Sequence, residues 1–232
     1  MAAAPTKQQQ LAQLLATLKK KTPAPAAVAS DRPVLEEILY AILREGCTGD
    51  MADDAYAKLK ETFFDWNEVR VSSVSEVADA IHGLPEAGSK SQRMIEFLQE
   101  VFEDIYSFDL GDIAKKGVKQ AAKQLGRYKS GVNDFVVAWV TQRTLGGHAI
   151  PLDQPTARLL QHLGILDADL DEYESARTTL EHFIPKASGP EFTDRVIHYA
   201  LSLQTAEAAE PPAKPKPPAK GKDAPAKGTK KK

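Results

Sequence analysis

Apolar residues recur at helical spacing along almost the whole of this chain. In the segment 89–106, for example, Met94, Leu98, Val101 and Ile105 fall on one stripe. Residues three or four positions apart share one face of an α-helix, so this pattern predicts an amphipathic helix. No segment alternates between apolar and polar residues for long enough to predict a strand. We therefore expect an all-α fold with short connections between its helices.

Composition divides the chain into three parts. Residues 1–32 combine a predicted helix over 7–21 with a linker rich in Pro and Ala. Residues 33–204 hold the main series of predicted helices, of which 108–126 is one, and form the predicted folded domain. Residues 205–232 are rich in Lys, Pro and Ala and contain no aromatic residue. Such a tail buries too little apolar surface to offset its chain entropy, so we expect it to be disordered.

The length of 232 residues suits one large domain or two small lobes that share a cleft. The single cysteine, Cys47, excludes an internal disulfide and an iron–sulfur cluster held by four thiolates. No apolar run approaches the roughly 18–20 residues of a membrane span, and the N-terminal segment lacks the layout of a signal peptide. The five histidines show no metal-ligand spacing. We expect a cytoplasmic monomer without a metal ion or a small-molecule cofactor.

Charge is distributed unevenly along the chain. The net charge of −2 combines +7 in residues 211–232 and +3 in residues 1–31 with −12 in residues 32–210. An acidic body with basic ends is unusual for a domain that binds duplex DNA. A lysine-rich tail can bind nucleic acid electrostatically, with a steep dependence on salt. The tail is also consistent with a solubilising extension or with binding to the acidic body.

The most informative stretch is residues 129–165. Gly131 and Val132 form a predicted turn ahead of an apolar helix, and Asp153 precedes a further helix a little over twenty residues later. This order of turn, apolar helix, acidic residue and helix resembles the helix-hairpin-helix (HhH-GPD) DNA glycosylases, and endonuclease III in particular. Arg158 also falls where the endonuclease III pattern has an arginine.

The resemblance covers about residues 33–203 and implies a two-lobed helical protein that acts on double-stranded DNA. In that family, backbone N–H groups of the hairpin hold a DNA phosphate, and the enzyme swings its target base into a pocket. The resemblance implies that Asp153 lies beside C1′ of the flipped nucleotide, where it stabilises positive charge and orients or deprotonates the nucleophile. The DNA-binding residues that it implies are Lys90, Lys129, Gly131, Val132, Asn133 and Arg158.

The chain departs from the family pattern around the hairpin. The second hairpin glycine is replaced by Asn133, a residue that tolerates left-handed backbone better than most. Asp134 follows, and its carboxylate would repel a phosphate, which Lys129 partly offsets. The lysine that attacks covalently in the lyases falls on Phe135, which cannot act as a nucleophile. The four-cysteine iron–sulfur loop is also missing, so we expect no Schiff-base lyase.

Two functions follow from this comparison. The first is a base-excision-repair hydrolase, a monofunctional DNA N-glycosylase that uses Asp153 and water. The alternative is a catalytically inactive relative that serves as a DNA-binding or protein-interaction module.

Each candidate residue also has a purely structural interpretation. Asp153, with Pro155 close behind it, is a good start to a helix and can act only as an N-cap. Gly131 can simply separate two helices. Lys90 can be a solvated lysine at a helix start, and Arg158 can form an ion pair inside the protein. The positions of these side chains in the folded protein decide between the two interpretations.

Overall fold

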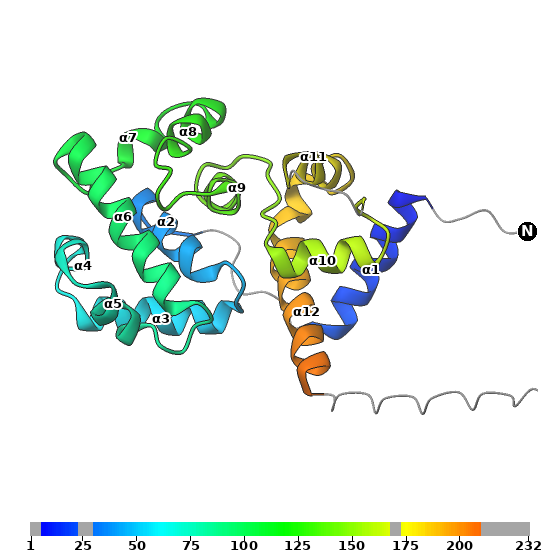
Figure 1. Ribbon diagram of the computed structural model, residues 1–232. Coiled ribbons are helices and arrows are strands. Elements are labelled where there is room, and N and C mark those ends of the chain that lie inside the picture. Colours follow the sequence, from blue (N-terminus) through cyan, green and yellow to red (C-terminus); the bar gives the residue numbers. More distant parts are fainter. Residues whose placement is uncertain (1–5, 23–29, 168–172, 210–232) are drawn as a thin grey trace, which may run out of the picture.

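The computed structural model describes residues 6–22, 30–167 and 173–209. Every regular element in these ranges is a helix, which confirms the all-α prediction. Figure 1 shows two helical lobes side by side. None of the helices described is both long and apolar enough to cross a membrane.

The first lobe is a continuous stretch of chain. It contains α2 (Val34–Arg44), α3 (Gly49–Thr62), α4 (Trp66–Val71), α5 (Val74–Ala80), α6 (Ala87–Ile105), α7 (Gly111–Ala114), α8 (Val118–Leu125) and α9 (Asp134–Arg143). The second lobe combines segments from both sides of this stretch. It contains α1 (Lys7–Lys21), α10 (Gln154–His162), α11 (Tyr173–Phe183), the short 3-10 helix η1 (Lys186–Ser188) and α12 (Gly189–Ala209).

Helix α2 is the centre of the first lobe. Ten of its eleven residues are buried, as expected for a helix that is apolar on nearly every side. Helices α3, α6 and α9 pack around it. The helix is followed by Gly46, whose φ of 69° is the left-handed conformation that glycine adopts without strain. The turn after α2 therefore reverses the chain at a fixed point close to the second lobe.

Helix α1 belongs to the second lobe. Its buried residues Leu11, Leu14 and Leu18 are part of the continuous hydrophobic core, and α1 packs against α12. The guanidinium of Arg195 on α12 donates to the carbonyl of Thr22 at 2.9 Å. The predicted separate unit 1–32 is thus, in its described part, integrated into the fold.

Two helices differ in extent from the sequence pattern. The segment 108–126 forms two helices, α7 and α8, because Gly117 has extended backbone (φ −58°, ψ 146°) and starts a new helix. Helix α12 continues to Ala209, beyond the predicted end of the domain at residue 204. Most of the predicted linker, residues 23–29, and the predicted disordered tail from residue 210 onwards lie outside the described residues.

The turn between α8 and α9 packs tightly against α6. A Cβ placed on Gly131 would lie 2.5 Å from the Cβ of Phe97 and 2.7 Å from the carbonyl oxygen of Arg93. Both distances are shorter than carbon atoms tolerate, so the close approach of the two segments requires a glycine. The ring of Tyr128 meets Phe97 edge-on at 5.7 Å between centroids and fixes the start of the same turn.

We predict that Gly131→Ala lowers the free energy of unfolding by about 1–3 kcal/mol, because the added methyl group forces α6 and the turn apart. Urea denaturation measures the change. Gly88→Ala is the matched control, since a Cβ on Gly88 meets no atom within 4 Å. A loss of stability in the control as large as that of Gly131→Ala would contradict the packing argument.

Candidate active site at the junction of the two lobes

Asp153 lies where the second lobe meets the first. It is the N-cap of α10, and its Oδ1 accepts a hydrogen bond from the backbone N–H of Thr156 at 3.0 Å. Its Oδ2 accepts from the backbone N–H of Gly46, the second residue after α2, at 3.2 Å. The residue is only 2% exposed. The carboxylate therefore caps its own helix and also links the two lobes.

Lys90 is buried behind the same turn. Its Nζ donates to the carbonyl oxygens of Ile42 and Leu43 at 2.9 and 3.0 Å, and also to that of Glu45. The residue is 3% exposed, and burial lowers the pKa of its ammonium group. The ammonium group thus stabilises the C-terminus of α2, where a positive charge is favourable. This position does not fit the predicted contact between Lys90 and a DNA phosphate.

Cys47 is a core residue. It is 1% exposed, and its Sγ donates to the carbonyl oxygen of Leu43 at 2.8 Å. Burial raises the pKa of the thiol, so the group remains protonated at neutral pH and is a poor nucleophile or metal ligand. The only cysteine of the chain therefore does not fit an iron–sulfur site.

The predicted hairpin is largely buried. Gly131 and Val132 are both buried. The backbone N–H of Val132 donates to the carbonyl of Tyr128 at 3.0 Å, and that of Ser130 donates to the Glu100 carboxylate at 3.2 Å. Two backbone amides of the turn are therefore already paired with protein groups and are not available to a phosphate.

Asn133 serves the fold in two ways. It is the N-cap of α9, with its Oδ1 accepting from the N–H of Val136 at 3.1 Å. Its Nδ2 donates to both carboxylate oxygens of Glu45, at 2.9 and 3.1 Å. Glu45 also forms an ion pair with Arg93 at 2.8 Å. Sequence analysis missed Glu45 because its partners lie far along the chain.

The exposed part of the hairpin carries both signs of charge. Lys129 is exposed, as the predicted phosphate contact requires. The Asp134 side chain is 68% exposed, and its backbone carbonyl accepts from Arg177 at 3.1 Å. The carboxylate of Asp134 thus faces solvent next to the turn.

Phe135 occupies the position expected for the lyase lysine and is a core residue. It is 3% exposed and stacks on Trp139, with 5.9 Å between ring centroids. The indole N–H of Trp139 in turn donates to the buried Glu37 carboxylate at 2.7 Å. Sequence analysis did not identify Glu37, since a glutamate in an apolar helix gives no signal of its partner.

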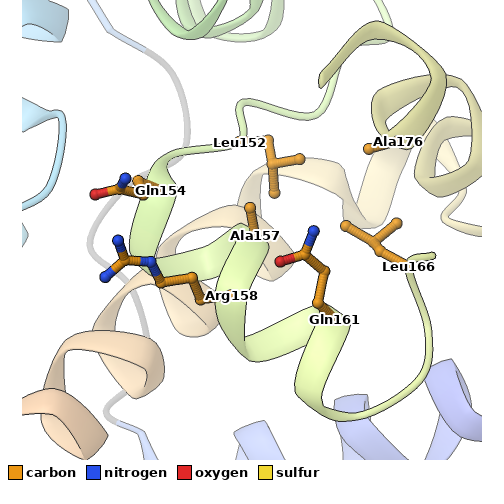
Figure 2. A pocket seen from close by; sticks show the side chains of 7 residues that line it. All are labelled: Leu152, Gln154, Ala157, Arg158, Gln161, Leu166 and Ala176. Carbon is orange, nitrogen blue, oxygen red and sulfur yellow. The ribbon is translucent and has the colours of Figure 1, made fainter. Parts of the chain in front are cut away.

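Arg158 is exposed on α10, one turn after Asp153. Figure 2 shows that Arg158 and Gln154 project to one side of the helix, next to a small pocket of about 130 Å³. The pocket has both polar and apolar walls, which are formed by Leu152, Gln154, Ala157, Arg158, Gln161, Leu166 and Ala176. The side chain of Arg158 is thus accessible to solvent, and its contact with DNA stays a prediction.

Polar contacts hold α9 against α12 near the same junction. Asp194 accepts from Arg143 at 2.8 Å, and the Arg44 guanidinium lies 3.8 Å from the same oxygen. Both guanidinium groups lie near the Trp139 ring, 4.6 and 5.4 Å from its centroid. Gln142 donates to Thr193 at 3.1 Å. These contacts fix the angle between the lobes and so position Asp153.

Comparison with solved structures identifies the fold. A trapped covalent complex of endonuclease III with DNA matches with a TM-score of 0.62 at 20% sequence identity, over 84% of this chain and 86% of that one. This chain has the fold of the helix-hairpin-helix DNA glycosylases. The 3-methyladenine DNA glycosylase of H. pylori, bound to 1,N6-ethenoadenine, matches this helix-hairpin-helix glycosylase fold with a TM-score of 0.55 at 16% identity, over 86% and 97%.

A third helix-hairpin-helix glycosylase structure is the 8-oxoguanine glycosylase/lyase of Clostridium acetobutylicum in complex with DNA. It matches with a TM-score of 0.58 at 13% identity, over 85% of this chain and 70% of that one. The sequence itself matches no protein-family model and no curated protein. At these identities the likeness establishes the helix-hairpin-helix glycosylase fold and does not establish the activity.

We predict that Lys90→Met lowers the free energy of unfolding by about 1–3 kcal/mol, because buried carbonyl groups lose a charged donor. Thermal or urea denaturation measures the loss. The control is Lys129→Met, which removes an exposed lysine and should change stability by less than about 0.5 kcal/mol. Equal effects of the two substitutions would contradict the structural role of Lys90.

A second prediction concerns Asp153. We expect Asp153→Ala to cost about 1–3 kcal/mol of stability, since it removes a helix cap and leaves the amide of Gly46 without its acceptor. Asp65→Ala is the matched control, because Asp65 caps α4 through one hydrogen bond of 2.8 Å and links no second lobe. If Asp153→Ala costs more stability than Asp65→Ala, the difference measures the contribution of the hydrogen bond that links the lobes. Equal losses in the two variants would show that this hydrogen bond contributes nothing.

Proposed function

We propose that this protein binds duplex DNA and acts in base excision repair as a monofunctional N-glycosylase, with Asp153 and water in place of a lysine nucleophile. The observation that carries the proposal is the position of Asp153 at the junction of the two lobes. In a fold that resembles DNA glycosylases solved with DNA, a base flipped out of the duplex would enter between the lobes.

In this mechanism the carboxylate of Asp153 orients a water molecule and accepts its proton as the oxygen attacks C1′. The N-glycosidic bond breaks, the base leaves with a proton, and an abasic sugar remains. The hydrogen bond from Thr156 holds Oδ1 in a fixed direction throughout. The absence of an amine at Phe135, which is buried against Trp139, supports hydrolysis without strand cleavage.

The burial of Asp153 sets a condition for this activity. Its Oδ2 must leave the amide of Gly46 before it can approach a nucleotide. Leaving a buried amide without its acceptor costs about 1–3 kcal/mol, and base flipping itself costs a few kcal/mol. The cost of opening is therefore comparable with that of a step that every enzyme of this kind carries out.

The second candidate is a DNA-binding protein with no glycosylase activity. One observation favours it: Asp153 is only 2% exposed, and both of its carboxylate oxygens accept hydrogen bonds from backbone amides. In this case Asp153 only fastens α10 to the turn after α2.

Base release from damaged duplexes distinguishes the two candidates. The substrates are labelled duplexes that carry uracil, 8-oxoguanine, 3-methyladenine or 1,N6-ethenoadenine. We expect the wild-type protein to leave alkali-labile abasic sites on at least one of them. We expect no strand cleavage before alkali, and no covalent adduct after borohydride treatment.

Asp153→Asn is the decisive variant, because Asn keeps an oxygen for the N–H of Thr156 but cannot accept a proton from water. Base release should fall at least about a hundredfold, as is typical when a general base is removed. Lack of release from every duplex, or equal release by the variant, would overturn the glycosylase and leave the DNA-binding candidate.

A further inference from the structure

The stretch of chain from the end of α7, through α8, to the hairpin carries an exposed basic face. Between residues 110 and 130 the chain has six basic residues and a single acidic one, Asp112. All six basic residues are exposed. We call this set the α7–α8 basic face: Lys115, Lys116, Lys119, Lys123, Arg127 and Lys129.

The geometry of α8 directs this charge towards solvent. Ala121 and Leu125 are fully buried and form the inner side of the helix. Lys119 and Lys123 are one turn apart and lie on the opposite side, because each residue advances the helix by about 100°. The apolar contacts of α8 thus hold the two lysines in a fixed direction away from the protein.

Little of this charge is neutralised by the protein. Lys115 forms an ion pair with Asp112 at 2.8 Å, and both side chains are highly exposed, so the pair is weak. Lys116 donates to the neutral amide oxygen of Gln124. Within the part of the chain that the structure describes, the other four basic residues have no carboxylate within 4.0 Å.

The hairpin beside this face is poorly suited to hold a phosphate by itself. The amides of Ser130 and Val132 are paired internally, and Asn133 is held by Glu45. The carboxylate of Asp134 is largely exposed at the start of α9, and its ion pair with Arg177, at 4.0 Å, offsets only part of its charge. An anion that approaches this end of the first lobe is therefore attracted more strongly to the lysines on and around α8 than to the tip of the hairpin.

We propose that the α7–α8 basic face is the main docking surface for the phosphate backbone of duplex DNA. The inference rests on the DNA binding of the proposed function and shifts the principal phosphate contacts away from the hairpin amides. Lys119 and Lys123 lie on α8, and the other four basic residues lie in the segments just before and just after it, so the positive charge runs along one continuous stretch of chain. A phosphate backbone is a row of negative charges and is complementary to such a stretch. In Figure 1, α7 and α8 lie together beside α9, so DNA on this face reaches towards the junction of the lobes.

Salt-dependent binding to a fluorescein-labelled 20-bp duplex tests the proposal with the full-length chain. The variant is Lys119→Gln/Lys123→Gln, which removes two charges without touching the buried side of α8. The control is Lys19→Gln/Lys20→Gln, which removes two exposed charges from α1 in the other lobe (Figure 1). Neither pair belongs to the Asp153 site.

The α8 variant should show a slope of log affinity against log salt that is less negative by about 1.8, since each phosphate contact contributes about 0.9. Its affinity at 50 mM salt should fall about tenfold. The α1 variant should bind within about twofold of the wild type at every salt concentration. Base release by the α8 variant should recover when the duplex concentration is raised, because Asp153 is intact.

The possible failures are distinguishable. Tight binding by the wild type with an unchanged slope in the α8 variant would overturn the docking surface and leave the proposed function standing. Equal losses in the two variants would show that charge alone matters and would also overturn it. Wild-type protein that binds no duplex at 50 mM salt would overturn both proposals. Binding to vesicles of anionic lipid in preference to the duplex would do the same.

Discussion

The buried C-terminus of α2 is the constraint on which the rest of the molecule depends. A helix surrounded by protein cannot hydrate its last carbonyl groups, so they must find donors inside the fold. Lys90 supplies these donors from α6. The residues that follow the helix then form the contacts that organise the junction: Glu45 holds the hairpin through Asn133, and Gly46 holds α10 through Asp153. One turn of chain thus connects the two lobes and the hairpin.

The hairpin shows how a sequence motif can keep its place while its contacts change. Gly131 is required because α6 lies against it. Phe135 and Trp139 fill the space behind α9 with stacked rings. A motif associated with phosphate binding therefore works here mainly in packing, and the positive charge available to a polyanion is displaced to the neighbouring helices. A local positive charge around α8 explains how a protein with a glycosylase fold could bind DNA although residues 32–210 carry a net charge of −12.

The sequence predicted the helical class, the order of most helices and the position of Asp153 as an N-cap, because helical periodicity and caps are local signals. It did not predict the position of Lys90, which looked like a surface lysine. A lysine is buried only when the carbonyls of a distant helix end surround it, and no local pattern reports that. The contact between Glu45 and Asn133 was missed for the same reason, since 88 residues separate them. The basic residues around α8 were visible in the sequence, but the net charge of −12 over residues 32–210 concealed this local positive cluster.

The pairing of α1 with α12 has a consequence for how the chain folds. The first lobe is contiguous in sequence, and its contacts are closed within about 110 residues. The second lobe needs both ends: the bond between Arg195 and Thr22 spans 173 residues. On the ribosome the first lobe can become compact before α1 meets its partner, because α12 is synthesised after the whole of that lobe. The second lobe is therefore completed after the first, when α12 closes a loop around a lobe that is already formed.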